Sequence, residues 1–391
     1  MSQPQINLSP DIKALIDDGY EIAIKAGHLV LYNVPYVNQQ KEVKRGTLVS
    51  TLDMAGNVTV KPSTHVVMFA GDQPCDKNGR ELENLKHSNA QQKICDGLVV
   101  ERSFSCKPKD DYRDYYHKMT TYAEMLTSHA LSIDPNATAR THAVIATDDP
   151  SGVFNYLDTA SGRAGISSIS QKLALQKVGI IGLGGTGSYV LDLITKTPIK
   201  EIHLFDSDFF LQHNAFRTPG AATLEELQSR VKKVDYLATR YKAMRKNIFA
   251  HGENINEANL SLLDEMGFVF ICIDNGSAKQ LIIEKLEADN TPFVDTGMGI
   301  NLVDDKLHGI VRVTTSTHNK RDHFKKRVIL SGHVDNDIYS KNIQIAELNA
   351  LNASLAVIKW KKLFGFYLDL ENEHSCNYTL DGNNISNIDQ V

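Results

Sequence analysis

Four polar side chains follow a glycine-rich turn at short, fixed distances. The turn reads GLGGTGS over residues 182–188, and Asp206, Asp208, Asn214 and Arg217 come after it. A second carboxylate beside the first can hold Mg2+ directly or through water, while an asparagine and an arginine can hold phosphate oxygens in a fixed, partly bidentate geometry. Hydride transfer has no use for the last three of these residues. The set therefore predicts chemistry on a phosphate.

The elements around the turn are a strand and a helix. Val178 to Ile181 is a short apolar run typical of a buried parallel strand, and residues 187–196 have helical periodicity. Between them stand four glycines, whose missing side chains let phosphate reach the backbone: Gly182, Gly184, Gly185 and Gly187. The helix start then offers free N–H groups and the positive end of its dipole. The turn predicts a phosphate-binding site.

Two further strands bring carboxylates to the same place. Residues 201–205 form a strand ending at Asp206, about twenty residues after the glycines, where an acidic side chain accepts hydrogen bonds from ribose hydroxyls. Residues 268–273 form another buried strand, which ends at Asp274. Because nucleotides bind at the carboxyl ends of parallel strands, Asp206, Asp208 and Asp274 should border one crevice. The alternative for Asp208 and Asp274 is a helix N-cap.

The order of these motifs resembles the ThiF/MoeB/HesA-type adenylyltransferases, whose relatives include the ubiquitin-activating enzymes. The resemblance covers about residues 163–352 and follows the pattern GxGGxGS, DxD, NxxR, a lysine on the next helix and an aspartate after a later strand. It implies a Rossmann-like, mostly parallel α/β sheet and a role for each matching residue: Asp206 for the ribose; Asn214, Arg217 and Lys233 for the phosphates; Asp274 for Mg2+.

Two positions in this comparison stay open. Lys232 adjoins Lys233, and either lysine could face the phosphates. Arg163, in SGRAGIS, stands just before the first strand, where family members carry an arginine that enters the active site of a partner subunit. The resemblance therefore implies a homodimer with Arg163 as that residue. The alternative for Arg163 is a solvent-facing linker arginine.

The reaction that the resemblance implies is attack of a carboxylate on the α-phosphate of ATP, giving an acyl adenylate and pyrophosphate. The carboxylate is usually the C-terminus of a ubiquitin-like or sulfur-carrier protein, and a conjugating enzyme is a further possible partner. Two anions must meet, so positioning and charge neutralisation dominate. A general base is unnecessary because the nucleophile is already ionised near neutral pH.

The cysteines depart from the family pattern. Many relatives bind zinc through two CxxC pairs, but none of the five cysteines has that spacing, so we expect no zinc. The loop that usually carries a thioester cysteine, residues 301–340, contains no cysteine. Cys106 and Cys376, both in polar surroundings, are the candidates for a reactive thiol, whereas Cys272 lies in an apolar strand and is expected in the core.

Two segments near the C-terminus carry further hypotheses. Residues 314–328, TTSTHNKRDHFKKRV, are rich in lysine and arginine and either steer an acidic face of the carrier or form an ordinary solvated loop. His318 and His323 lie in this segment, with no third metal ligand nearby. Residues 343–366 predict a long helix, in which Trp360 is expected to pack and Asn349 and Asn352 to contact a partner or form a buried network.

The first 160 residues predict a separate, smaller α+β domain. Strands are expected at residues 20–36, 46–52 and 64–70, and a helix at residues 110–133. Four tyrosines of this region form either a contact face or part of the core: Tyr112, Tyr115, Tyr116 and Tyr122. Residues 135–162 are expected to be a linker. We therefore expect an accessory domain over residues 1–160, suited to partner recognition, and the adenylation domain over residues 161–391.

Length, composition and net charge limit the classes of protein to which this chain can belong. The 391 residues exceed what one ordinary core supports, and 42% hydrophobic with 23% charged content is globular. A net charge of -5 argues against a general nucleic-acid binder, and no run is long enough for a membrane span or a signal peptide, so we expect a cytoplasmic protein. Other functions remain open: an NAD-dependent oxidoreductase, a nucleotide-binding module without catalysis, or adenylation of a peptide or a tRNA base.

Overall fold

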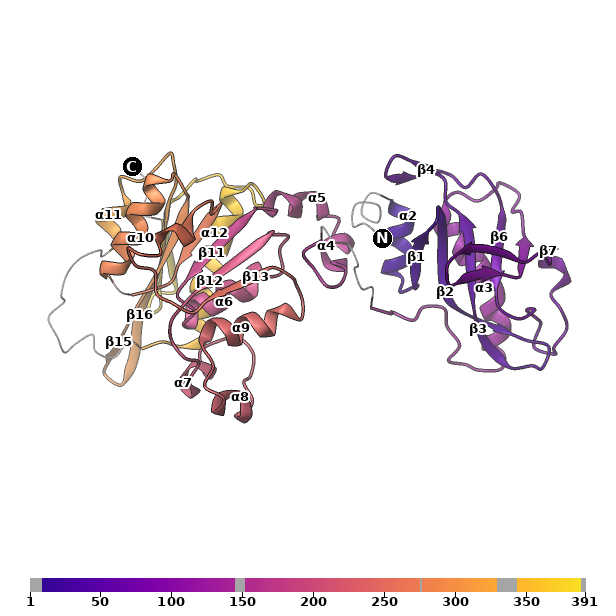
Figure 1. Cartoon of the computed structure of the whole chain (residues 1–391), viewed down its shortest axis with the longest axis horizontal. Coiled ribbons are helices and arrows are strands. Elements are labelled where there is room, and N and C mark those ends of the chain that lie inside the picture. Colours follow the sequence, from indigo (N-terminus) through magenta and orange to yellow (C-terminus); the bar gives the residue numbers. More distant parts are fainter. Residues whose placement is uncertain (1–8, 145–151, 275, 329–342, 388–391) are drawn as a thin grey trace. The chain divides into compact units, whose positions relative to one another are not determined.

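The computed structural model describes residues 9–144, 152–274, 276–328 and 343–387 (Figure 1). The chain divides into two compact units. Unit 1 comprises Met1–Gly152 and Tyr156–Ser167, and unit 2 comprises Val153–Asn155 and Ser168–Val391. Each unit has its own hydrophobic core.

Unit 1 is built on an antiparallel sheet of six strands. Their order is β1 (Ile22–Lys25), β2 (His28–Val37), β3 (Val43–Thr51), β6 (Val66–Ala70), β10 (Arg102–Ser105) and β7 (Lys86–Ser88). Two small hairpins accompany it: β4 (Met54–Ala55) with β5 (Val58–Thr59), and β8 (Gln92–Cys95) with β9 (Leu98–Val100). The helices are α2 (Pro10–Asp17), α3 (Tyr115–Leu131), α4 (Thr159–Arg163) and the 3-10 helix η1 (Glu83–Leu85). The predicted strand over residues 20–36 is two strands, because Ala26 and Gly27 turn the chain with positive φ.

The helix predicted over residues 110–133 begins later, at Tyr115. Asp114 caps it, since its side chain accepts a hydrogen bond of 2.7 Å from the backbone N–H of His117. Tyr112, Tyr115 and Tyr122 are buried in the core of unit 1, so the hypothesis of a tyrosine contact face is wrong for these three residues.

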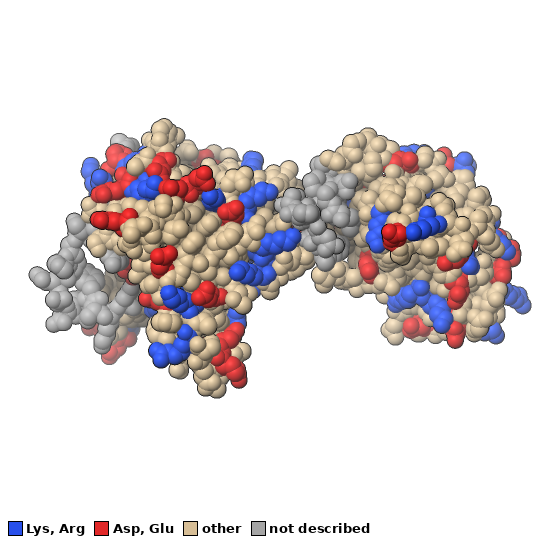
Figure 2. All heavy atoms as spheres, viewed as in Figure 1, with Lys and Arg blue, Asp and Glu red and all other residues tan. Residues whose placement is uncertain are grey.

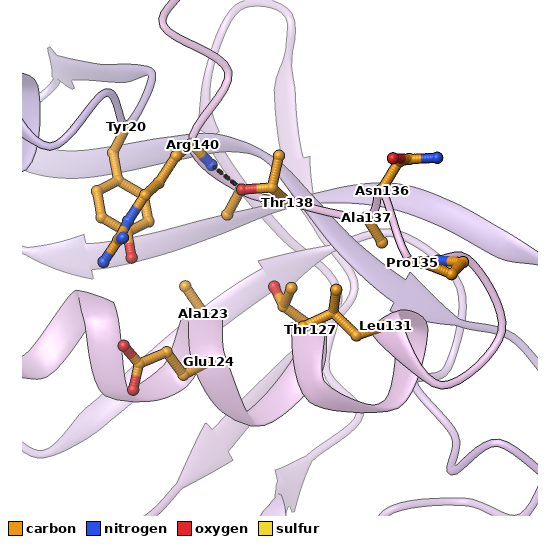
Figure 3. A pocket seen from close by; sticks show the side chains of 11 residues that line it. Tyr20, Ala123, Glu124, Thr127, Leu131, Pro135, Asn136, Ala137, Thr138 and Arg140 are labelled. Atoms are coloured by element: carbon orange, nitrogen blue, oxygen red, sulfur yellow. Dashed lines mark hydrogen bonds between the residues drawn. The ribbon is translucent and has the colours of Figure 1, made fainter.

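The linker predicted over residues 135–162 is also wrong for much of its length. Ala137 and Ala139 are buried in unit 1, and α4 belongs to the same unit, whereas Val153–Asn155 join unit 2. Small apolar residues in a polar stretch gave no periodic signal. Residues 135–140 form one wall of a groove of about 490 Å3, and α3 forms the other (Figure 3). Thr127 of α3 faces this groove, and its buried hydroxyl has no hydrogen-bond partner among the described residues.

Unit 2 is a doubly wound α/β unit with an eight-stranded sheet. Its first five strands run parallel: β13 (Ile248–His251), β12 (Glu201–Phe205), β11 (Lys177–Ile181), β14 (Phe268–Ile271) and β15 (Phe293–Val303). Three antiparallel strands complete it: β16 (Lys306–Ser316), β17 (Ser375–Thr379) and β18 (Asn384–Asn387). The long hairpin of β15 and β16 extends beyond the parallel strands (Figure 1). This is the mostly parallel sheet predicted from the motifs, preceded by the predicted smaller α+β domain, whose sheet is antiparallel.

Helices cover both faces of the sheet of unit 2. One face packs against α6 (Gly185–Ile194), α9 (Lys233–Lys242) and α12 (Ala346–Leu363). The other face packs against α10 (Gly276–Ala288) and α11 (Phe324–Arg327). The remaining short helices are α5 (Ser167–Ser170), α7 (Gln212–Ala215), α8 (Leu224–Gln228), η2 (Gln171–Leu173) and η3 (Leu260–Leu263).

The predicted long C-terminal helix is α12. Trp360 is fully buried on it, packed against Phe268, Phe270 and Phe364, which confirms its expected packing role. No helix within the described ranges combines the length and the apolar character that a membrane crossing needs.

Candidate nucleotide site

The glycine turn joins the end of β11 to α6. Gly182 has φ of +87°, and its N–H donates to the carbonyl of Phe205 at 2.8 Å. The next N–H, of Leu183, donates to Asp206 Oδ2 at 2.7 Å. The turn and the end of β12 are therefore tied together, and α6 begins with Gly184 as its N-cap.

The four glycines differ in what a side chain would meet. A Cβ on Gly182 would lie 2.6 Å from the carbonyl oxygen of Cys272, and one on Gly185 or Gly187 would overlap Asn349 or the carbonyl of Gly182. A Cβ on Gly184 would meet nothing within 4 Å. Packing thus accounts for three glycines. Gly184 alone opens onto free space at the helix N-terminus, where a phosphate would approach the backbone.

Asp206, Asp208 and Lys233 form a charged cluster beside the turn. Lys233 Nζ lies 2.6 Å from Asp208 Oδ2 and 3.5 Å from Asp206 Oδ1. The side chains of Asp206 and Lys233 are each only 8% exposed, whereas that of Asp208 is 70% exposed. Lys232 lies elsewhere, since its Nζ donates to the backbone carbonyl of Gly252. Lys233, and not Lys232, is therefore the lysine that lies beside Asp206 and Asp208.

Asn214 and Arg217 lie on the segment that follows Asp208. Asn214 is almost fully buried at α7, and its Oδ1 accepts from the N–H of Leu211 at 2.8 Å. Its Nδ2 and the Nε of Arg217 are both buried, and neither has a hydrogen-bond partner in the part of the chain that the structure describes. Since buried N–H groups are nearly always paired, these two donors on one segment are available to a ligand that supplies acceptors.

Asp274 follows β14, the strand next to β11, and lies exposed just before α10. It therefore stands at the same carboxyl edge as Asp206. Cys272 lies between Asp274 and the strand, and burial raises the pKa of its thiol to about 12. Cys272 is thus a packing residue, as expected from its apolar strand.

Three residues named from the sequence lie outside this cluster. Arg163 is the exposed last residue of α4 and belongs to unit 1. Cys106 is half-buried in unit 1, where its N–H donates to the hydroxyl of Tyr122 at 2.7 Å. Cys376 is half-buried on β17, and burial, followed by the charge of Glu373, raises the pKa of its thiol.

Part of the basic segment packs against the rest of unit 2, whereas Lys325 and Lys326 are exposed. Arg321 donates to the carbonyl of Glu287 at 2.6 Å, and His323 is buried with its Nε2 2.9 Å from the carbonyl of Thr315. Acidic and basic side chains mix over the face seen in Figure 2. Over the described ranges, no group of three or more histidine, cysteine or acidic side chains is placed to hold a metal ion.

A buried triad near the site was not predicted from any sequence motif. Asp295 on β15 is completely buried and pairs with Lys279 of α10 and Arg312 of β16, each at 2.7 Å. These three residues lie far apart in the chain, and no motif joins them. On the other side of the sheet, Asn349 of α12 accepts a hydrogen bond from Thr186 at 3.1 Å, and Asn352 donates to the carbonyl of Gly297 at 3.1 Å. Asn349 Nδ2 and Asn352 Oδ1 have no hydrogen-bond partner among the described residues, so the buried network that was one alternative for this helix is only partly formed there.

Two family models match this chain, and known proteins are similar to part of it. Residues 158–352 match the ThiF family, and residues 10–159 match a domain of unknown function, DUF6791. The chain is similar to ubiquitin-like modifier-activating enzyme 5 of Aedes aegypti, with 23% identity over 159 residues that cover 38% of this chain and 40% of that protein. The same enzyme of Rattus norvegicus is 25% identical over 160 residues, with the same two coverages. The match thus spans only about two fifths of these relatives.

Two solved structures are similar at low identity. E. coli MccB with ATP aligns with a TM-score of 0.46 and 18% identity, covering 59% of this chain and 68% of that chain. PaaA aligns with a TM-score of 0.43 and 16% identity, covering 56% and 74%. Likeness at this level carries no information about function.

Proposed function

We propose that this chain, whose residues 158–352 belong to the ThiF family expected from its motifs, is an ATP-dependent adenylyltransferase. In the proposed reaction, a carboxylate oxygen of an acceptor bonds to the α-phosphorus of ATP. The bond from that phosphorus to the oxygen of the β-phosphate breaks. The products are an acyl adenylate and pyrophosphate.

The observation that carries this proposal is the pair of unpartnered buried donors, Asn214 Nδ2 and Arg217 Nε. Leaving a buried donor unpaired costs roughly 1–3 kcal/mol, so such a pair is expected to be satisfied by a ligand. Phosphate oxygens supply the acceptors, and the guanidinium adds charge. The pyrophosphate of a dinucleotide would offer acceptors as well, so the direct comparison of ATP with NAD+ decides between the two ligands.

The neighbouring residues fit the rest of ATP. Asp206 holds the end of the glycine turn and is the residue for the ribose, while Lys233 and the N–H groups at the start of α6 face the phosphates. Asp208 and Asp274 are the hard oxygen donors that Mg2+ requires. The ion would offset phosphate charge. The chain's own part is to orient two anions toward each other, which needs no general base.

The acceptor is proposed from the relatives. These relatives are named as activating enzymes of ubiquitin-like modifiers, so we propose the C-terminus of a ubiquitin-like or sulfur-carrier protein, with a peptide as the nearest alternative. Unit 1 is proposed to recognise the carrier or a conjugating enzyme. The homodimer, with Arg163 acting in the partner's site, is part of the same proposal.

A thioester step would need a nucleophilic cysteine, and the candidates remain Cys106 and Cys376. The raised pKa of Cys376 keeps its thiol protonated at neutral pH, which slows attack on an acyl adenylate. We therefore propose that the acyl group passes directly from the adenylate to the nucleophile that finally receives it, with release of AMP, unless Cys106 first forms a thioester. Replacing each cysteine by alanine and looking for a reducible adduct distinguishes the two.

The test is thermal stabilisation by ATP with Mg2+ against NAD+ and NADH. A ligand at a hundred times its dissociation constant stabilises by about 2.7 kcal/mol, which raises the melting temperature measurably. Asn214→Asp keeps the oxygen that accepts from Leu211 but puts a carboxylate where the donor stood, so it should abolish stabilisation by ATP, as should Asp274→Ala. Lys232→Met is the matched control and should respond like the wild type.

Stabilisation by ATP that both variants lose supports the proposal and justifies a search for the acceptor by pyrophosphate exchange. Stabilisation by NAD+ instead, or an ATP response that survives in Asn214→Asp, would reject it. ATP binding without exchange for any carrier would leave a nucleotide-binding module without catalysis.

A further inference from the structure

A charged triad of Asp295, Lys279 and Arg312 lies outside the set of residues proposed to hold ATP. Asp295 accepts one cation on each oxygen: Lys279 Nζ at 2.7 Å on Oδ1, and Arg312 at 2.7 Å on Oδ2. Arg312 also donates to Thr314 Oγ1 at 2.8 Å. The exposed fractions of the three side chains are 0% for Asp295, 7% for Lys279 and 21% for Arg312. Two cations and one anion give the triad a net charge of +1.

The triad is close to the glycine turn. Asp295 of β15 lies opposite Ile271 of β14 in the parallel register of these two strands, and the Thr296 hydroxyl donates to the carbonyl of Ile271 at 3.3 Å. Cys272 comes next, and a Cβ placed on Gly187 would approach its Cβ to 3.3 Å. Cys272 thus lies between the glycine turn, which would hold the phosphates, and the strand that carries Asp295.

The sheet surface around Arg312 lacks side chains on β15. Gly297 stands opposite Arg312 in the register, and Gly299 stands opposite Ile310, so all four lie on the same face. A Cβ on Gly297 would come within 2.7 Å of Arg312, which means that the guanidinium lies across this glycine. A Cβ on Gly299 would meet nothing within 4 Å. The two glycines form an open shelf beside the partly exposed guanidinium.

We propose that Arg312 binds the carboxylate of the acceptor before adenylation, with the last residues of the acceptor lying on the shelf of Gly297 and Gly299. This inference rests on the proposed function. A guanidinium suits a carboxylate because its fork can make two parallel hydrogen bonds. Asp295 fixes the orientation of the fork, and Lys279 offsets the charge of Asp295, so Arg312 keeps its attraction for an anion.

The same arrangement explains why the acyl adenylate would leave Arg312 after the reaction. Once a carboxylate oxygen has bonded to the α-phosphorus, the acyl group has lost its negative charge, and its attraction to Arg312 falls. Arg312 therefore binds the substrate form of the acceptor in preference to the acyl adenylate.

The experiment uses the full chain labelled with 15N at the arginine Nε positions, and two probes that differ only in charge: glycylglycine and its C-terminal amide. The Arg312 signal is identified by its absence in Arg312→Gln. We expect glycylglycine to shift this signal in a saturable way and the amide to bind about tenfold more weakly or not at all, the equivalent of losing one charge-assisted hydrogen bond. Lys306→Gln, which removes a cation from the tip of the same hairpin, should leave the titration unchanged.

Arg312→Lys keeps the ion pair to Asp295 while removing the fork, so it should weaken glycylglycine binding in a protein that still folds. An unmoved Arg312 signal, or equal shifts by acid and amide, overturns the inference. The two proposals fail separately: loss of ATP stabilisation with an intact carboxylate response rejects only the adenylyltransferase, whereas normal ATP binding with no carboxylate response rejects only the role of Arg312.

Discussion

Replacing Lys233 by methionine should destabilise unit 2 before any ligand is added. The substitution leaves Asp206 nearly buried without its cation, and breaking a buried ion pair costs about 3–5 kcal/mol in general. Two features reduce the cost here. Asp206 still accepts hydrogen bonds from the N–H groups of Leu183 and Asp208, and Asp208 is 70% exposed and can turn to water. We therefore expect a loss of about 2 kcal/mol, or roughly 4–8 °C in melting temperature for a unit of this size.

The assay is urea unfolding followed by tryptophan fluorescence. Trp360 is the only tryptophan of the chain and is buried in the core of unit 2, so its emission reports the unfolding of that unit alone. Lys232→Met is the matched control, because it removes a single hydrogen bond to the carbonyl of Gly252 and should cost about 1 kcal/mol or less. An equal or larger loss in Lys232→Met would refute the assignment of Lys233 to the carboxylate cluster.

Three further outcomes are expected. Burial lowers the pKa of Lys118 in unit 1 to about 8 from 10.5. Between these two values the unfolded chain binds more protons than the folded chain, so the free energy of unfolding should rise with pH by up to about 3 kcal/mol. Hydrogen exchange of α3 at pH 7 and 9.5 should show this rise in the wild type and not in Lys118→Met. Iodoacetamide should label Cys376 more slowly at pH 7 than a cysteine in a short peptide, because its raised pKa lowers the thiolate fraction; equal rates by peptide mapping would contradict the burial argument. Gly182→Ala should destabilise unit 2 by more than about 1 kcal/mol in the tryptophan assay, because the φ of Gly182 is +87° and an added Cβ would meet Cys272. Gly184→Ala should leave the stability of unit 2 unchanged and weaken only ATP binding, because an added Cβ there meets nothing within 4 Å.

The sequence predicted three parallel strands of unit 2, β11, β12 and β14, because each is a short and largely apolar run, and those of β12 and β14 are soon followed by an aspartate. That pattern is local, so Asp206 and Asp274 could be placed at the edge of the sheet without knowing which strands are neighbours. The triad of Lys279, Asp295 and Arg312 could not be found in the same way. Its members come from a helix, a parallel strand and an antiparallel strand, and only the register of the hairpin brings them together.

Burial was hardest to predict where polar and apolar properties share one side chain. Tyr112, Tyr115 and Tyr122 lie in the core with their hydroxyls hydrogen-bonded to backbone or to Asp53, and such partners are invisible in sequence. The choice between Lys232 and Lys233 was undecidable for a related reason. Lys232 is the extended N-cap of α9 and Lys233 its first helical residue, so their side chains point in different directions.

The charges at the proposed site lead to a dependence on a divalent cation. Lys233 and Arg217 bring two positive charges against three carboxylates, Asp206, Asp208 and Asp274, so the site as a whole carries a charge of -1. A triphosphate entering alone would add several negative charges and would compete with both carboxylates for Lys233. Mg2+ bound by Asp208 and Asp274 would free Lys233 to contact phosphate. We therefore expect ATP and Mg2+ to bind cooperatively, with each ligand weakening by the same factor when the other is withheld.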